Sequence, residues 1–150
     1  MRSTEMMIEV RREKGFSLIE LLIAVAIVGV LSALAIPQYE SFLQQSRRAD
    51  AMTELSSLIM EMEQHRSSQN SYLGAAANGD VGAINETLLM ELDDDVQLFY
   101  EITIKSATRS TFELQAEPIN AQADDACGTI TIGTNGYFQY SSGTATQCVE

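Results

Sequence analysis

The hydrophobic residues of this chain follow three patterns, and the first is one continuous apolar run. Between residues 16 and 36 the polar residues are Ser17, Glu20 and Ser32. A helix of this length, at about 1.5 Å per residue, spans the hydrocarbon core of a bilayer. The run therefore predicts a helix that lies in apolar surroundings.

The second pattern begins after Pro37 and is amphipathic. Apolar residues recur there at helical spacing: Met52, Leu55, Leu58, Ile59 and Met62. Together the two patterns predict one long helix over residues 16–67, with its second half packed on a globular domain. Pro37 lacks a backbone N–H and clashes with the preceding turn, so we expect a kink or a break there. Gly29 weakens the helix eight residues earlier.

The third pattern is an alternation of apolar and polar residues, which is typical of strands with one buried face. It occurs over residues 98–104, 111–116, 128–132 and 137–140. The last two runs flank Asn135-Gly136, which favours a tight hairpin turn because both residues tolerate positive φ. Four such strands need a cover for their apolar face, and the amphipathic half of the helix supplies it. We predict an α+β fold, with a long helix laid across a four-stranded antiparallel sheet.

Residues 70–95, between the helix and the first strand, are rich in alanine, glycine and asparagine and predict a connecting loop. A short helix capped by Asn85 and running through Leu92 is expected within it. Residues 93–95 are three consecutive aspartates. Consecutive carboxylates cannot all point at one cation and no EF-hand spacing is present, so a solvated loop is favoured over a calcium site.

The charge of the chain limits its partners. The sequence has 9 basic and 21 acidic residues, and residues 1–15 hold four of the basic ones. Without that segment the chain has five basic and 18 acidic residues, a formal charge of −13. Such a surface repels phosphate backbones, so we do not expect the isolated chain to bind nucleic acid.

Catalytic and metal-binding patterns are absent from the sequence. His65 is the only histidine, and its position near the end of an amphipathic helix predicts a surface residue. Without a second histidine or a spaced cysteine cluster there is no zinc pattern, and no glycine-rich phosphate loop is present. We therefore expect no enzyme activity, no cofactor and no metal.

The two cysteines, Cys127 and Cys148, lie beyond the apolar run. Basic residues precede that run, so the positive-inside rule leaves the amino end in the cytoplasm and sends the rest outside. An exported pair of cysteines in an oxidising compartment is most simply a disulfide. Closing a loop of about 22 residues would stabilise the fold by roughly 3 kcal/mol in the chain-entropy model.

The start of the chain carries a dense local signature. Gly15 closes a basic leader directly before Phe16. Glu20 lies one helical turn into the apolar run, and Pro37 follows the run. These residues resemble the amino-terminal signature of type IV pilins, and the region between the two cysteines resembles the disulfide-bounded ending of many type IVa pilins.

The resemblance implies a role for each of these residues. A prepilin peptidase would cut after Gly15, and Phe16 would become the N-methylated first residue. Glu20 would meet the amino terminus of a neighbouring subunit, in a pair that sets register more than it adds affinity. As an ordinary anchor residue, Glu20 would instead extend to the membrane surface. The stretch from Gly29 to Pro37 would be able to melt within a filament.

The resemblance also implies an organisation and a function. Residues 1–15 would be the prepilin leader, 16–43 the transmembrane and assembly helix, and 44–150 the head domain with its disulfide. The chain would be a structural subunit of a type IV pilus, held in the inner membrane until assembly machinery there joins it to other pilin subunits in an extracellular filament. Adhesion, twitching motility and DNA uptake remain open as its role, and so does its status as a major or a minor pilin.

Two other interpretations remain. A pseudopilin of type II secretion shares the amino-terminal signature, although the terminal disulfide and the lack of an obvious calcium loop favour a pilin. A secreted or membrane-anchored binding domain would use residues 1–35 as a secretory signal cut after residues 33–35. That interpretation leaves the junction after Gly15 unexplained. The possible starts of translation are Met1, Met6 and Met7.

Overall fold

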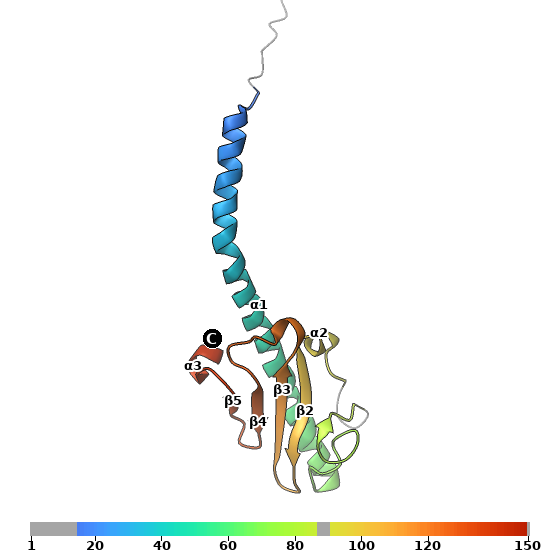
Figure 1. The fold of residues 1–150 in the computed structure, drawn as a ribbon. Helices are drawn as coiled ribbons and strands as arrows, with labels where there is room; N and C mark the ends of the chain where they lie inside the picture. The colour runs from blue at the N-terminus through green and yellow to red at the C-terminus, as the bar shows by residue number, and fades with distance from the viewer. Residues whose placement is uncertain (1–14, 87–90, 150) are drawn as a thin grey trace, which may run out of the picture. The chain divides into compact units, whose positions relative to one another are not determined.

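The computed structural model describes residues 15–86 and 91–149, which belong to two compact units. The first unit ends at Tyr39 and the second begins at Glu40. One helix, α1 (Leu18–Gln69), contributes residues to both (Figure 1). It continues through Pro37, so no break occurs there. A proline removes one backbone hydrogen bond, and the leucine and alanine residues that precede it favour helix.

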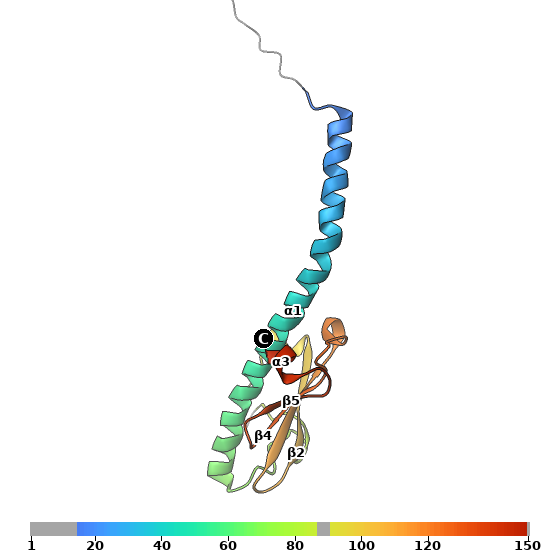
Figure 2. The same ribbon diagram turned by 90° about the vertical axis from the view of Figure 1, so that its left-hand side faces the viewer.

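In the second unit α1 buries one face against a sheet (Figure 2). The buried residues of α1 are spaced three or four apart: Arg48, Ala51, Leu55, Leu58, Met62 and His65. This spacing confirms the amphipathic pattern. His65, however, was expected at the surface and is buried. Its Nε2 donates to the carbonyl oxygen of Leu73 at 3.0 Å, so the loop that follows the helix covers it.

The sheet has five antiparallel strands in the order β1-β2-β3-β4-β5. They are β1 (Gly82–Ala83), β2 (Tyr100–Ala107), β3 (Phe112–Pro118), β4 (Ile130–Gly133) and β5 (Phe138–Tyr140). The α+β class is confirmed, but the predicted count of four strands is wrong. The extra strand, β1, has only two residues, which is too few for an alternating pattern to reveal.

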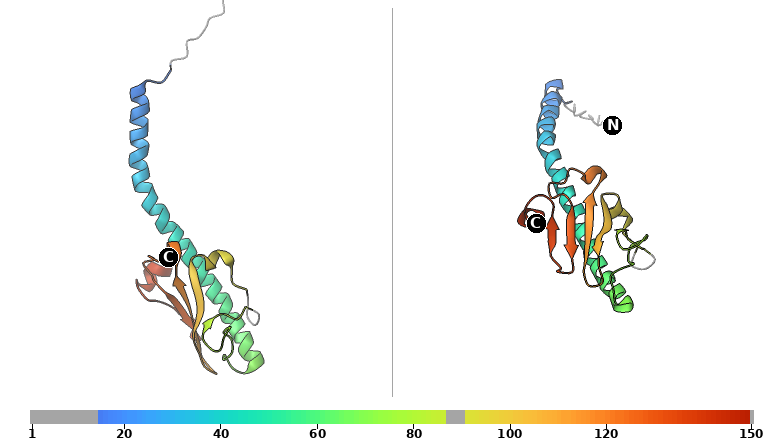
Figure 3. Two further views of the ribbon diagram at one scale, coloured as in Figure 1. Left: turned by 45° about the vertical axis from the view of Figure 1, so that its right-hand side comes forward. Right: turned by 60° about the horizontal axis from the view of Figure 1, so that its bottom comes forward.

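One face of the sheet carries the core of the second unit. Alternate side chains are buried over residues 100–104 of β2, 112–116 of β3 and 130–132 of β4, including Ile102, Leu114 and Ile130. These side chains form one cluster with the buried residues of α1. The right-hand view in Figure 3 shows the strands in front of α1, and no helix of the described residues covers their other face.

Short helices occupy places where the sequence predicted loops. Asp93 caps α2 (Asp94–Gln97), because its Oδ1 accepts from the backbone N–H of Asp95 at 2.8 Å. The solvated loop expected at residues 93–95 is therefore the start of a helix. The helix expected after Asn85 falls mostly on residues 87–90, outside the described residues, and Leu92, at its expected end, is not helical. The remaining helices are η1 (Asn120–Gln122) and α3 (Ala145–Val149).

Candidate assembly helix and disulfide region

The apolar start of α1 is the first candidate site. From Phe16 to Ile36 every side chain is exposed, and Leu22 and Ile27 leave more than half of their surface uncovered. An 18-residue window of this helix has a mean hydropathy of 2.7 and none of it is buried. Within the described residues α1 is the one helix long and apolar enough to cross a membrane, judged by length and composition. An apolar surface of this size requires a lipid or protein partner.

Glu20 lies in the first turn of this helix. A carboxylate is favoured there by the partial positive charge of the helix amino terminus. Gly15 and Phe16 lie directly before the helix, and Phe16 is 85% exposed. The Glu20 carboxylate is exposed and has no hydrogen bond or ion pair with any described residue.

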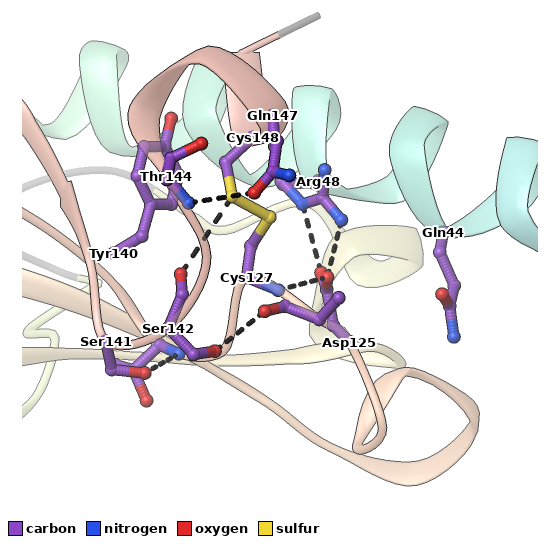
Figure 4. The surroundings of a disulfide bond; sticks show 12 residues. Gln44, Arg48, Asp125, Cys127, Tyr140, Ser141, Ser142, Thr144, Gln147 and Cys148 are labelled. Atoms are coloured by element: carbon purple, nitrogen blue, oxygen red, sulfur yellow. Dashed lines mark hydrogen bonds and ion pairs between the residues drawn. A yellow bond between two sulfur atoms is a disulfide. The ribbon is translucent and has the colours of Figure 1, made fainter.

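The second candidate site lies around the disulfide. Cys127 and Cys148 are joined, with their Cα atoms 5.9 Å apart, which confirms the disulfide expected from the sequence (Figure 4). The bond connects the loop before β4 to α3, so β4 and β5 lie between the bonded residues. Both cysteines are buried.

Beside the disulfide lies a buried ion pair. Asp125 accepts hydrogen bonds from Arg48 Nε at 3.1 Å and from Arg48 Nη2 (Figure 4). The same carboxylate accepts from the Tyr100 hydroxyl at 2.7 Å and from Gln122 Nε2 at 2.8 Å. The backbone N–H of Cys127 supplies a further donor at 3.0 Å. All donors needed by a buried carboxylate are therefore present.

Gln122 links this cluster back to α1. Its Nε2 also donates to the backbone carbonyl of Gln44 at 3.0 Å, and the whole residue is buried. Its Oε1 is buried and has no hydrogen-bond partner among the described residues. The side chain thus anchors the loop after β3 to the helix and leaves one acceptor unsatisfied.

The cluster shifts the pKa values of its members. Burial by itself raises the pKa of Asp125, but the hydrogen bonds from Arg48, Cys127, Tyr100 and Gln122 outweigh it and lower the pKa. Burial likewise lowers the pKa of Arg48, and Asp125 outweighs it, so that pKa is raised. Burial and the bond to Asp125 both raise the pKa of Tyr100. Asp125 and Arg48 are therefore both charged at neutral pH.

The sequence did not reveal this cluster. Arg48 continues the three-and-four spacing of the buried α1 residues. That spacing is the one feature of the sequence that could have predicted its burial. Tyr100 falls on the predicted apolar face of its strand, but nothing in the sequence pairs it with Asp125. Metal ligands do not gather anywhere in the described part of the chain.

Comparison with known proteins identifies the family. A family model described as "Type IV minor pilin ComP, DNA uptake sequence receptor" matches residues 37–131, more than half of the chain. The chain belongs to this family of type IV pilins. A second model, "Prokaryotic N-terminal methylation motif", matches residues 10–36 of the pilin, the region that contains Gly15, Phe16 and Glu20.

Individual relatives agree with the family. The pilin is 48% identical over 48 residues to a fimbrial protein of Pseudomonas aeruginosa, covering 32% of the pilin and 31% of that protein. It is 41% identical over 61 residues to the type IV major pilin protein PilA of Myxococcus xanthus, covering 41% and 28% of the two chains. A fimbrial protein of Moraxella nonliquefaciens is 26% identical over 134 residues, 81% of the pilin and 85% of the relative. The pilin thus matches only about a third of the length of the first of these relatives.

Proposed function

We propose that this pilin is a structural subunit of a type IV pilus, inserted in the inner membrane first and polymerised afterwards. The observation that carries the proposal is the exposed apolar start of α1 in a chain of this family. In a monomer, lipid would cover this surface. In a filament, the corresponding helices of other subunits would cover it. In both environments the apolar surface of the helix is kept out of water.

Processing would come before assembly. A prepilin peptidase would cut the chain after Gly15, which removes the basic leader and makes Phe16 the first residue. Methylation of the Phe16 nitrogen would follow. The match of the N-terminal methylation model to residues 10–36 supports methylation in this region.

Glu20 would act after processing. In a filament its carboxylate would lie in apolar surroundings, where an unpaired charge costs several kcal/mol. The new amino terminus of a neighbouring subunit is a cation that would neutralise it. Such a pair fixes the register of one helix against the next, while its desolvation cost cancels much of its attraction.

The rest of the chain would be divided according to these roles. Residues 1–15 would form the leader, residues 16–43 the membrane and assembly helix, and residues 44–150 the head displayed on the filament. Gly29 and Pro37 would mark a weak section of the assembly helix, although residues 29–37 are helical in the chain described here. Extraction from the membrane would need inner-membrane assembly machinery, because exchanging lipid for protein contacts gains little hydrophobic free energy.

DNA reception is a second candidate function, because the matching family model carries that description. The charges of the head oppose it. The head has five basic residues after residue 15, and two of them are paired with carboxylates, Arg48 with Asp125 and Lys105 with Glu113. Arg47 and Arg66 lie over the neutral rings of Phe99 and Tyr72. DNA affinity depends mainly on cations free to meet phosphates. We therefore place structural assembly first and DNA reception second.

Mass spectrometry of the mature amino terminus tests the proposal. Sheared surface filaments and membranes would be analysed separately. An N-methylated Phe16 in the filament fraction is the expected result. The same terminus found only in membranes would favour a pseudopilin, and a terminus near Ile36 would mean a secreted domain and end the filament proposal.

A binding assay tests the second candidate. A labelled DNA duplex would be titrated with the purified pilin in detergent at about 50 mM salt, where electrostatic binding is strongest. Weak binding, with no sequence preference, is expected. Submicromolar affinity for a particular sequence would place DNA reception first.

A further inference from the structure

The sequence contains two Asn-Gly pairs, Asn78-Gly79 and Asn135-Gly136, and the head holds them differently. In such a pair the backbone nitrogen of the glycine can attack the side-chain amide of the asparagine, because glycine has no Cβ to obstruct the approach. Open space surrounds both glycines, since an added Cβ would meet no atom within 4 Å at either position. The hydrogen bonds of the two pairs therefore decide which of them can react.

The reacting groups of Asn135-Gly136 are both engaged. The pair lies in the turn between β4 and β5 (Figure 1). Asn135 Oδ1 accepts from the N–H of Tyr137 at 3.2 Å, and the N–H of Gly136 donates to the carbonyl of Gly133 at 2.9 Å. Ring closure needs the carboxamide to turn back onto the nitrogen of Gly136, so both hydrogen bonds oppose it.

Asn78 lies at the exposed tip of a loop. Residues 77–81 are all exposed. The Asn78 carboxamide has no hydrogen bond with any described residue, and the backbone of Gly79 pairs with Ala76 in an isolated bridge. No hydrogen bond within the described chain therefore holds the Asn78 side chain away from the nitrogen of Gly79.

The base of the same loop is anchored to the core. The N–H of Ala77 donates to the carbonyl of Ala83 at 2.9 Å, and the N–H of Asn85 donates to the carbonyl of Ala75 at 3.2 Å. Ala75 is itself fully buried. The tip can therefore change chemically while the core beneath it stays packed.

We propose that Asn78 is a site of spontaneous deamidation in the folded head. The nitrogen of Gly79 gives its proton to solvent base and attacks Cγ of Asn78. The bond from Cγ to the side-chain nitrogen breaks, that nitrogen leaves as ammonia, and a cyclic succinimide remains. Water then opens the ring by adding its oxygen to one of the ring carbonyl carbons, whose bond to the nitrogen of Gly79 breaks as that nitrogen regains a proton.

The carbonyl that water attacks decides the product. Attack at the former side-chain carbon gives aspartate, and attack at the backbone carbon of residue 78 gives isoaspartate. The new carboxyl group is ionised at neutral pH in both products. It lies two residues from Asp80, whose Oδ1 accepts from the N–H of Gly74 at 2.9 Å. Isoaspartate also redirects the backbone through Cβ, next to the bridge of Ala76 and Gly79. Deamidation thus changes both the charge and the backbone path of the tip.

Incubation of the purified full chain in detergent, in mildly alkaline buffer made with heavy-oxygen water, tests the proposal. Product formed during the incubation carries the heavy oxygen, which distinguishes it from aspartate present beforehand. Mass spectrometry of peptides gives the deamidation rates at Asn78 and Asn135, in the folded chain and in urea. The unfolded chain supplies the intrinsic rate of each pair, because neither turn persists there.

We expect the two pairs to react at similar rates in urea. In the folded chain, Asn78 should react within about threefold of its rate in urea, whereas Asn135 should react at least about tenfold more slowly than in urea. Slowing of Asn78 by the same factor as Asn135 would overturn the proposal, because the loop tip would then be restrained as well. Reaction of Asn135 as fast as Asn78 in the folded chain would also overturn it.

Two matched variants assign the product by its charge. Ion exchange of the unsubstituted chain after incubation should separate a more acidic species. Asn78→Gln should not form this species, because the longer side chain closes its ring far more slowly, and Asn135→Gln should still form it. Hydrogen exchange over β2, β3 and β4 shows that each variant is folded. An equal amount of the acidic species in Asn78→Gln would place the modification elsewhere and overturn the assignment.

Discussion

Arg48 on α1 and Asp125 in the loop before β4 are 77 residues apart in sequence and form a buried ion pair, with Arg48 Nε 3.1 Å from Asp125 Oδ2. The pair joins the helix to the disulfide region, and Tyr100 and Gln122 complete its hydrogen bonding. Its burial makes it sensitive to the loss of either member, because the remaining charge would be left without a partner in a dry environment.

Removal of one member of the Arg48–Asp125 pair should therefore lower the free energy of unfolding more than removal of both. We expect Asp125→Ala to destabilise the chain by about 3–5 kcal/mol, and Arg48→Met with Asp125→Leu to recover most of that loss. Urea denaturation of the purified chain in detergent measures both. Lys105→Ala is the control, because the Lys105–Glu113 pair is partly exposed to solvent and contributes less than about 1 kcal/mol. If the loss of unfolding free energy in the double variant equals the sum of the losses in the two single variants, the two residues are not coupled.

The lowered pKa of Asp125 predicts a loss of stability in acid. The group binds fewer protons in the folded than in the unfolded chain, so its contribution is complete above its ordinary value of 3.8 and is lost as pH falls through the lowered pKa. Urea midpoints measured from pH 7 down to about pH 2.5 test this. Asp125→Asn should flatten the acid part of the curve, and an unchanged slope in that variant would assign the effect to other carboxyls.

Two glycines with similar backbone angles should respond differently to alanine. Gly128 has φ +62, and an added Cβ would lie 2.2 Å from Ser141 Oγ, which already accepts from the N–H of Thr129. Gly136 has φ +73 with open space around it. We expect Gly128→Ala to cost about 2–4 kcal/mol and Gly136→Ala only about 1 kcal/mol, measured by thermal unfolding. Similar losses of stability in the two variants would mean that backbone strain, and not the contact with Ser141, determines both.

The methionines of α1 offer a pair that differs in burial. Met62 is 0% exposed in the core, whereas Met60, two residues earlier, is 66% exposed. Met62→Ala should cost about 2–5 kcal/mol because it leaves a cavity, and Met60→Ala less than about 0.5 kcal/mol. Denaturant midpoints compare the two. A large effect at Met60 would contradict the helix orientation described here.

Glu20 should matter for assembly and not for processing. Glu20→Ala leaves the junction between Gly15 and Phe16 unchanged, so mass spectrometry should find the same mature amino terminus. The amount of the variant in sheared filaments should fall at least about tenfold, because register is lost. Ser32→Ala, a polar substitution in the same apolar run, serves as the control and should assemble normally. Normal incorporation of Glu20→Ala would remove its proposed role.

The sequence by itself determined the elements with a strong local pattern. Continuous apolarity over residues 16–36 predicted the exposed helix, and three-and-four spacing predicted which face of α1 is buried. Alternation predicted β2, β3, β4 and β5, although Leu98, counted in the first strand, precedes β2 and is 57% exposed. These features depend on neighbours a few residues away, so the order of residues is enough to reveal them.

Only the tertiary structure decided the contacts between distant residues. Arg48 and Asp125 meet because the helix crosses the sheet at that point, and His65 is buried because the following loop folds back over it. The two residues of β1 form a strand only because β2 offers them a partner. A two-residue strand is too short to show a period, and helical spacing alone does not name the partner of a buried charge. The stability of both comes from hydrogen bonds that exist only after the chain has folded.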